Sequence, residues 1–92
     1  MEYIITFNNT NSAIKAEQLL LSENLHVGVM PLPSQIRAGC GICLRLTSEE
    51  IGVALRILDK NSIRETDLFS RTAFDNNFIY SEVTDRSNIS IK

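Results

Sequence analysis

Several residue types are scarce or absent in this 92-residue sequence: it has no tryptophan, one histidine, two cysteines and two prolines. Long hydrophobic runs are absent too, and the N-terminus lacks the basic and then apolar order of a signal peptide, so we expect neither a transmembrane helix nor a secretory leader. Two cysteines only three positions apart cannot build the disulfide framework of a small secreted domain. These absences predict a cytoplasmic protein with free thiols.

An excess of positive charge is also absent. Nine basic and eleven acidic residues give a net charge of −2, which argues against a nucleic-acid partner. Two cysteines and the single His26 do not supply the four ligands of a structural zinc site, so we expect no metal and no cofactor. Nothing places His26 beside a cysteine as a general base, and we therefore expect no enzyme activity.

The apolar patterning predicts one domain built from six elements. They are strand 2–7, helix 10–23, strand 25–30, strand 40–46, a helix that follows the cap and first-turn acids of 47–50 and closes at 60–61, and strand 63–70. The order βαββαβ predicts an α+β, ferredoxin-like sandwich, in which a four-stranded antiparallel sheet carries both helices on one face. The other face then needs water, a partner or added chain.

The end of the chain lies beyond this repeat. We assign residues 1–70 to the domain and residues 71–92 to a C-terminal extension, which adds one or two strands over 74–83 or forms a tail. Small sheets often pair with another copy, so a homodimer is left open.

The segment Met30–Cys43 departs furthest from ordinary fold-building sequence. It contains two prolines, two glycines and both cysteines, and no acid occurs between residues 24 and 48. Proline fixes φ and glycine relaxes it, so a thiol between them is held in a specified place. The residues predicted to shape this loop are Pro31, Pro33 and Gly39.

The CxxC motif of this segment has three interpretations: a redox pair, half a metal site, or two cysteines with separate roles. A redox pair normally lies at a helix N-terminus, whereas here the motif enters a strand, on which residues three apart point to opposite faces. Cys40, between two glycines, is the candidate for a reactive and accessible thiol, and Cys43 is a second thiol that packs. A packing role for Cys40 is equally compatible with the sequence.

Three residues near Cys40 are candidates for binding its substrate or an anion. Arg37 precedes it by three positions, and a guanidinium there favours a thiolate. Ser34 offers a hydrogen bond, and Gly41 lets a ligand approach the sulfur.

The stretches FNNTNSAIKAEQLL and VGVMPLPSQIRAGCGICLRL resemble a family of small bacterial proteins described as putative Se/S carrier protein-like. The resemblance covers residues 3–58, and its most specific part is Pro31, Pro33, Cys40 and Gly41. Ala13 and Glu17 carry a weaker pattern, which any amphipathic helix can contain. It implies that the cysteine before Gly41 holds sulfur or selenium as a persulfide or selenosulfide, between a donor protein and an acceptor protein. Cys43 departs from the pattern and either resolves the persulfide or is incidental. The alternative is a non-catalytic ligand-binding or protein-interaction module, in which Cys40 is structural.

Overall fold

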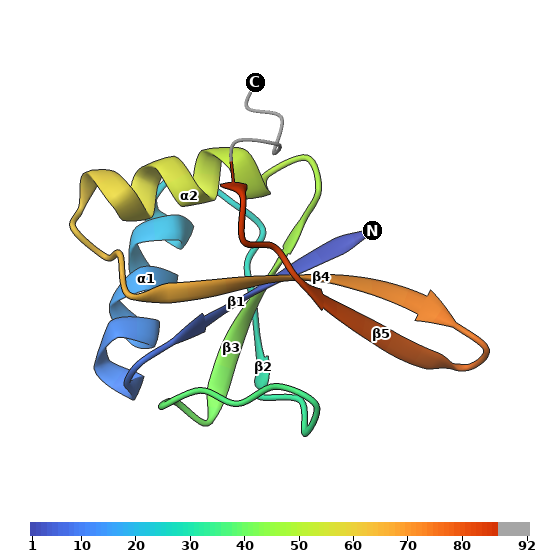
Figure 1. The fold of residues 1–92 in the computed structure, drawn as a ribbon. Coiled ribbons are helices and arrows are strands. Elements are labelled where there is room, and N and C mark those ends of the chain that lie inside the picture. Colours follow the sequence, from blue (N-terminus) through green and yellow to red (C-terminus); the bar gives the residue numbers. More distant parts are fainter. Residues whose placement is uncertain (87–92) are drawn as a thin grey trace.

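The computed structural model describes residues 1–86 as two helices and one five-stranded antiparallel sheet (Figure 1). The elements are β1 (Glu2–Phe7), α1 (Thr10–Ser22), β2 (Gly28–Pro31), β3 (Ile42–Thr47), α2 (Ile51–Lys60), β4 (Thr66–Phe74) and β5 (Asn77–Glu82). The strand order is β2-β3-β1-β4-β5, so β1 lies in the centre between β3 and β4. The predicted α+β class is confirmed.

The number of strands differs from the prediction, because the chain beyond residue 70 completes β4 and returns as β5. β4 pairs with β1 along its first part and with β5 along its last part, from Phe69 to Phe74. Asp75 and Asn76 form the two-residue turn with φ of 50° and 62°, a conformation that Asp and Asn tolerate. The boundary proposed at residue 70 thus falls inside a strand, and the possible tail at residues 87–92 lies outside the described residues.

The second strand also differs from its prediction. β2 begins at Gly28 rather than at residue 25, because Leu25 and Val27 lie before the strand and pack against the core. It includes Pro31, which a strand at the edge of a sheet can accept since one of its sides needs no ladder donor.

The ends of the helices explain their lengths. The Asn9 side chain caps α1 by accepting the Ser12 N–H at 2.8 Å. The predicted cap of α2 is wrong: the N-cap is Glu50, which makes no side-chain cap hydrogen bond, and no acid lies in the first turn. The Glu50 carboxylate accepts the backbone N–H of His26 at 2.9 Å instead, which ties the start of α2 to the segment before β2.

Both helices end in a Schellman motif, and these motifs yield a stability prediction. After α2 the Ile63 N–H reaches the Leu58 carbonyl at 2.9 Å, and Ser62 is held at a φ of 63°. Because a left-handed residue with a side chain is strained, we expect Ser62→Gly to raise the free energy of unfolding by about 0.5–1 kcal/mol in urea titrations. Asn24 occupies the same position after α1, and Asn24→Gly should change stability less, because asparagine already tolerates this conformation. A loss of stability in Ser62→Gly would contradict this account.

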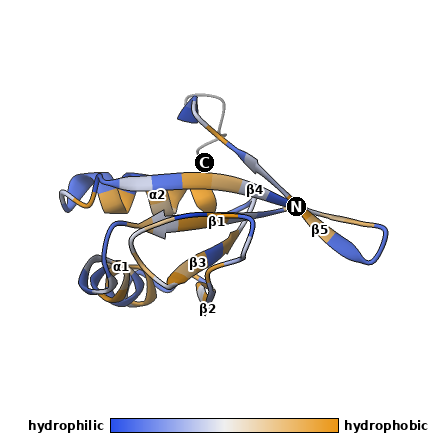
Figure 2. Cartoon of the chain, turned by 60° about the horizontal axis from the view of Figure 1, so that its bottom comes forward, coloured by the Kyte–Doolittle hydropathy of each residue, from blue (hydrophilic) through white to orange (hydrophobic). Residues whose placement is uncertain are grey.

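The main core lies on one face of the sheet, where both helices cover it. In Figure 2 the hydrophobic colouring gathers where α1 and α2 face the strands, while the turn of the β4–β5 hairpin is hydrophilic. The helices and the strands contribute to one cluster, whose buried members are Ile5, Phe7, Ala13, Ala16, Leu20, Cys40, Leu44, Leu46, Ile51, Ala54, Leu58 and Leu68. Burial of these side chains is the main force that holds the helices on the sheet.

The opposite face of the sheet is covered in part by a side chain beyond residue 70. Ile4 is fully buried although it points away from the helices, on the same face as Thr6. The Arg71 side chain lies over this face: its Nη1 is 3.4 Å from Glu2 Oε1 and 3.7 Å from Met30 Sδ, and its guanidinium carbon lies 3.7 Å from the centre of the Phe78 ring. Added chain, one of the three covers predicted for this face, therefore supplies part of the cover.

Candidate functional site

The loop between β2 and β3, residues 32–41, brings Cys40 to the N-terminal end of α1. Its base is closed by the Leu32 N–H, which donates to the Gly41 carbonyl at 2.9 Å, and a turn inside it is closed from Ile36 to Pro33 at 3.0 Å. Gly39 lies directly against the β1–α1 junction: a Cβ at this position would be 2.0 Å from the Asn8 carbonyl oxygen. The missing side chain therefore lets the loop approach the helix start.

The Cys40 sulfur lies between two hydrogen-bonding groups. Its Sγ is 3.7 Å from the Oγ1 of Thr10, the first residue of α1, and it accepts the Ile42 N–H at 3.5 Å. A hydroxyl, a backbone N–H and the N-terminal end of a helix all favour negative charge on a sulfur atom. In the structure the thiol donates to the Thr10 hydroxyl, and this hydroxyl can turn to donate to the sulfur when the sulfur is an anion.

The accessibility of Cys40 differs from the prediction. The residue is 1% exposed and belongs to the cluster between the helices and the sheet, together with Phe7, Ala13 and Leu44. The physical reason is the close approach at Gly39, which presses the loop onto the helix start and turns the thiol inward.

The polar residues predicted around the thiol are not brought to it. Arg37 and Ser34 are both exposed, and the Ser34 hydroxyl donates to Gln35 Oε1 at 3.3 Å. Within residues 1–86, the Arg37 guanidinium makes no hydrogen bond or ion pair with Cys40. Their anion-binding role stays a prediction. Gly41 has open space where a side chain would be, with no atom within 4 Å.

Thr10 is a residue that the sequence analysis missed. Its signal was present, since Asn9 is a good N-cap and marks a helix N-terminus just after it. The missing information was tertiary: thirty residues separate Thr10 from Cys40, and only the packing of the loop on the helix start joins them.

Cys43 lies on the other side of the sheet. It stands in register with Thr6 and Met30, is fully buried, and its Sγ donates to the Pro31 carbonyl at 3.8 Å. Burial raises the pKa of the Cys43 thiol from its ordinary 9.0 to about 11, although the positive charge of Arg71 acts in the opposite direction. Both cysteines are free, and they lie on different sides of the sheet, Cys40 in the main cluster and Cys43 opposite Thr6. The strand predicted over 40–46 begins only at Ile42, so Cys40 lies in the loop and strand alternation is not what separates the two thiols.

The family model described as "Putative Se/S carrier protein-like" matches residues 2–70. The chain belongs to this family. No curated protein and no solved structure matches the chain. The matched region runs from β1 into β4 and includes the loop with Pro31, Pro33, Cys40 and Gly41, whereas Arg71 and β5 lie beyond it.

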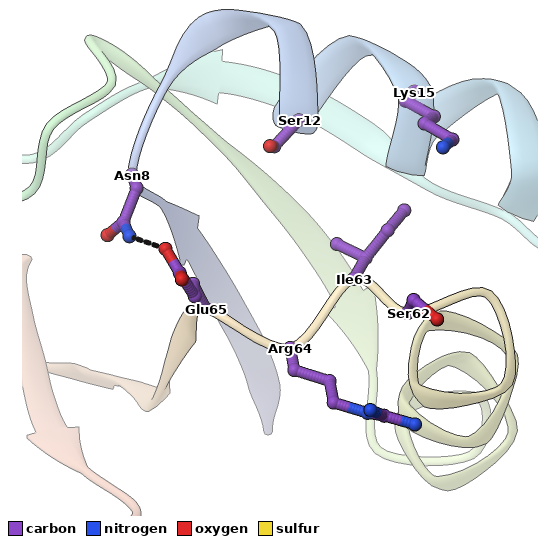
Figure 3. Close-up of a pocket in the computed structure, with 7 residues that line it drawn as sticks. All are labelled: Asn8, Ser12, Lys15, Ser62, Ile63, Arg64 and Glu65. Carbon is purple, nitrogen blue, oxygen red and sulfur yellow. Dashed lines mark hydrogen bonds between the residues drawn. The ribbon is translucent and has the colours of Figure 1, made fainter.

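A pocket that does not contain the thiol borders the first turns of α1 (Figure 3). It has a volume of about 280 Å³, and the Asn8 amide donates to the Glu65 carboxylate at its edge. The lining residues are Asn8, Ser12, Lys15, Ser62, Ile63, Arg64 and Glu65, which include neither cysteine. One of its two cations, Arg64, is already paired with Asp59 at 2.9 Å.

Two further findings concern the described part of the chain. Within residues 1–86, no cluster of three or more His, Cys, Asp or Glu side chains is arranged to hold a metal ion. None of the helices described there has the length and apolar character needed to cross a bilayer.

Proposed function

We propose that the protein carries sulfur or selenium on Cys40. The thiolate attacks the terminal sulfur of a persulfide, R–S–SH, on a donor protein; the new bond forms Cys40–S–SH, and the donor leaves as its thiolate. An acceptor thiolate later takes the terminal atom by the same exchange, and a selenium atom would travel as the corresponding selenosulfide. The transfer moves one chalcogen atom without net oxidation, so no further redox partner is needed.

The observation that carries this proposal is the position of the Cys40 sulfur against the first turn of α1. The Ile42 N–H and the Thr10 hydroxyl lie where they can stabilise the anion that the exchange requires. Membership of the carrier-like family supports the identity of the cargo. The protein then acts as a cytoplasmic relay between a donor and an acceptor, with no turnover of its own.

Two finer assignments belong to the same proposal. The first four strands, in the order β2-β3-β1-β4, are compatible with the ferredoxin-like arrangement, to which β5 adds an edge. A homodimer through that edge stays a proposal.

Persulfide loading tests the carrier role. After treatment with a low-molecular-weight persulfide and removal of excess reagent, we expect intact mass to rise by one sulfur atom and peptide mapping to place it on Cys40. Cys40→Ser should abolish the gain, while the matched Cys43→Ala should retain it. Thr10→Val, which keeps the shape but removes the hydroxyl, should lower the loaded fraction, and Thr10→Ser should restore it. Equal loading of Cys40→Ser and the unmodified protein would overturn the proposal.

One observation favours a second candidate function. The burial of Cys40 in the core is what a packing residue would show, and the protein would then be a non-catalytic binding or interaction module. Thiol labelling near neutral pH separates the two: a Cys40 that reacts only on global unfolding fits the module, whereas one that reacts from the folded state fits the carrier.

A further inference from the structure

The proposed carrier role conflicts with the closed position of its thiol. An exchange needs the attacking sulfur to reach the donor sulfur in a direct line, and only 1% of Cys40 is exposed. The loop 32–41 carries this thiol into the main cluster, where it lies against the start of α1. A movement of this loop is therefore the smallest change that would expose Cys40.

The loop is held closed by few contacts. Within it the only buried side chains are those of Ile36 and Cys40, and Ile36, at 5% exposure, lies outside the main hydrophobic cluster. Its other attachments are the Cys40 side chain, which is hydrogen-bonded to Thr10, and the close approach of Gly39 to the Asn8 backbone. A segment with so few buried apolar contacts opens at a much lower free energy than the core beneath it.

Gly41 lies where the hinge of such a loop movement would be. In the closed structure its φ is not positive and a side chain would meet no atom within 4 Å, so neither backbone strain nor packing requires glycine. It stands at the base of the loop, where its carbonyl accepts the Leu32 N–H and β3 begins one residue later. A glycine whose freedom the closed form does not use is well placed to absorb a change in φ and ψ.

We infer that the loop 32–41 is a lid that turns about Gly41, withdraws Ile36 and Gly39 from their contacts, and exposes Cys40. The inference rests on the proposed function for its purpose, because such a lid is useful only if the thiol that it carries reacts. The donor protein would then meet a thiol that is protected between transfers. Opening itself is a property of the free protein and can be measured without any cargo.

Labelling of single-cysteine proteins with an aromatic disulfide reagent tests the lid. The Cys43→Ala protein reports on Cys40, and the Cys40→Ala protein reports on Cys43, which lies on the other face of the sheet. We expect Cys40 to react faster than Cys43, and its labelling rate to depend little on low concentrations of urea because the opening exposes little surface.

Ile36→Ala should accelerate the labelling of Cys40 at least about tenfold while leaving that of Cys43 nearly unchanged. Gly41→Ala should slow Cys40 about two- to fivefold, because the open loop loses freedom.

Two outcomes would overturn the lid. One is parallel labelling of both cysteines with the same steep urea dependence, which would mean that only global unfolding exposes them. The other is Cys40 labelling at the rate of a free thiol in all variants. If labelling follows the lid pattern but persulfide loading fails, the carrier proposal is wrong and the lid remains. If loading succeeds but Ile36→Ala does not change the labelling rate of Cys40, the lid is wrong and the carrier proposal remains.

Discussion

Gly39→Ala should lower the free energy of unfolding by about 3 kcal/mol, at the upper end of what overpacking usually costs. The added Cβ would lie 2.0 Å from the Asn8 carbonyl oxygen and 2.9 Å from its carbonyl carbon, and both are backbone atoms that no side-chain rotation can move away. The loop or the β1–α1 junction must therefore shift. Urea titration followed by circular dichroism measures the loss.

Gly41→Ala is the matched control for this substitution. It adds the same methyl group two residues later, at a position with no neighbour within 4 Å, and neither glycine has a positive φ. We expect a change within about 0.5 kcal/mol, as for ordinary surface substitutions. Equal losses of stability in the two variants would show that the clash with Asn8 does not determine the effect of the added methyl group.

Raising the pH from 9 to 11 should remove stability through Cys43. In the unfolded chain this thiol ionises near its ordinary pKa of 9.0, whereas in the folded protein burial raises the pKa to about 11. The unfolded state therefore loses its proton first, and its ionisation draws the equilibrium toward unfolding. The stabilisation is complete below pH 9, falls across this interval, and amounts to about 2.7 kcal/mol at most.

The control for the pH effect is Cys43→Ala. The variant keeps every other group that titrates in alkali, so the difference between its unfolding curves and those of the unmodified protein isolates the thiol. We expect the unmodified protein to lose its stability more steeply between pH 9 and 11. Curves that stay parallel through this interval would contradict the assigned burial effect.

The elements near the site were predictable where local chemistry decides them. Asn9 and the apolar spacing after it mark α1 correctly, because a cap and a hydrophobic face act within a few residues. The cap of α2 was misjudged at Glu50, since its carboxylate is taken by the backbone of His26, twenty-four residues away. A hydrogen-bond partner this far away in the sequence cannot be predicted from the residues around the helix start.

The candidate site shows the same division. The special geometry of the loop around Gly39 and Cys40 was visible in the sequence, because glycine beside a thiol is a local signal. Its orientation was not: the thiol faces the core because Gly39 lies against Asn8, and it is hydrogen-bonded to the Thr10 side chain. Arg37 is near Cys40 in sequence, yet among the described residues it makes no hydrogen bond or ion pair with the thiol.

The cover over the second sheet face has a consequence for how the family's fold can be stabilised. The family match ends at residue 70, and Arg71, the residue that lies across Glu2 and Met30, comes directly after it. The Arg71 Nε is buried and has no hydrogen-bond partner within residues 1–86, so this arrangement leaves one N–H donor unsatisfied although the guanidinium is paired with Glu2. Because β4 runs through residue 70, the end of the family match is not an end of the fold: a chain cut there would stop inside β4 and lose both the ion pair of Arg71 with Glu2 and the whole of β5.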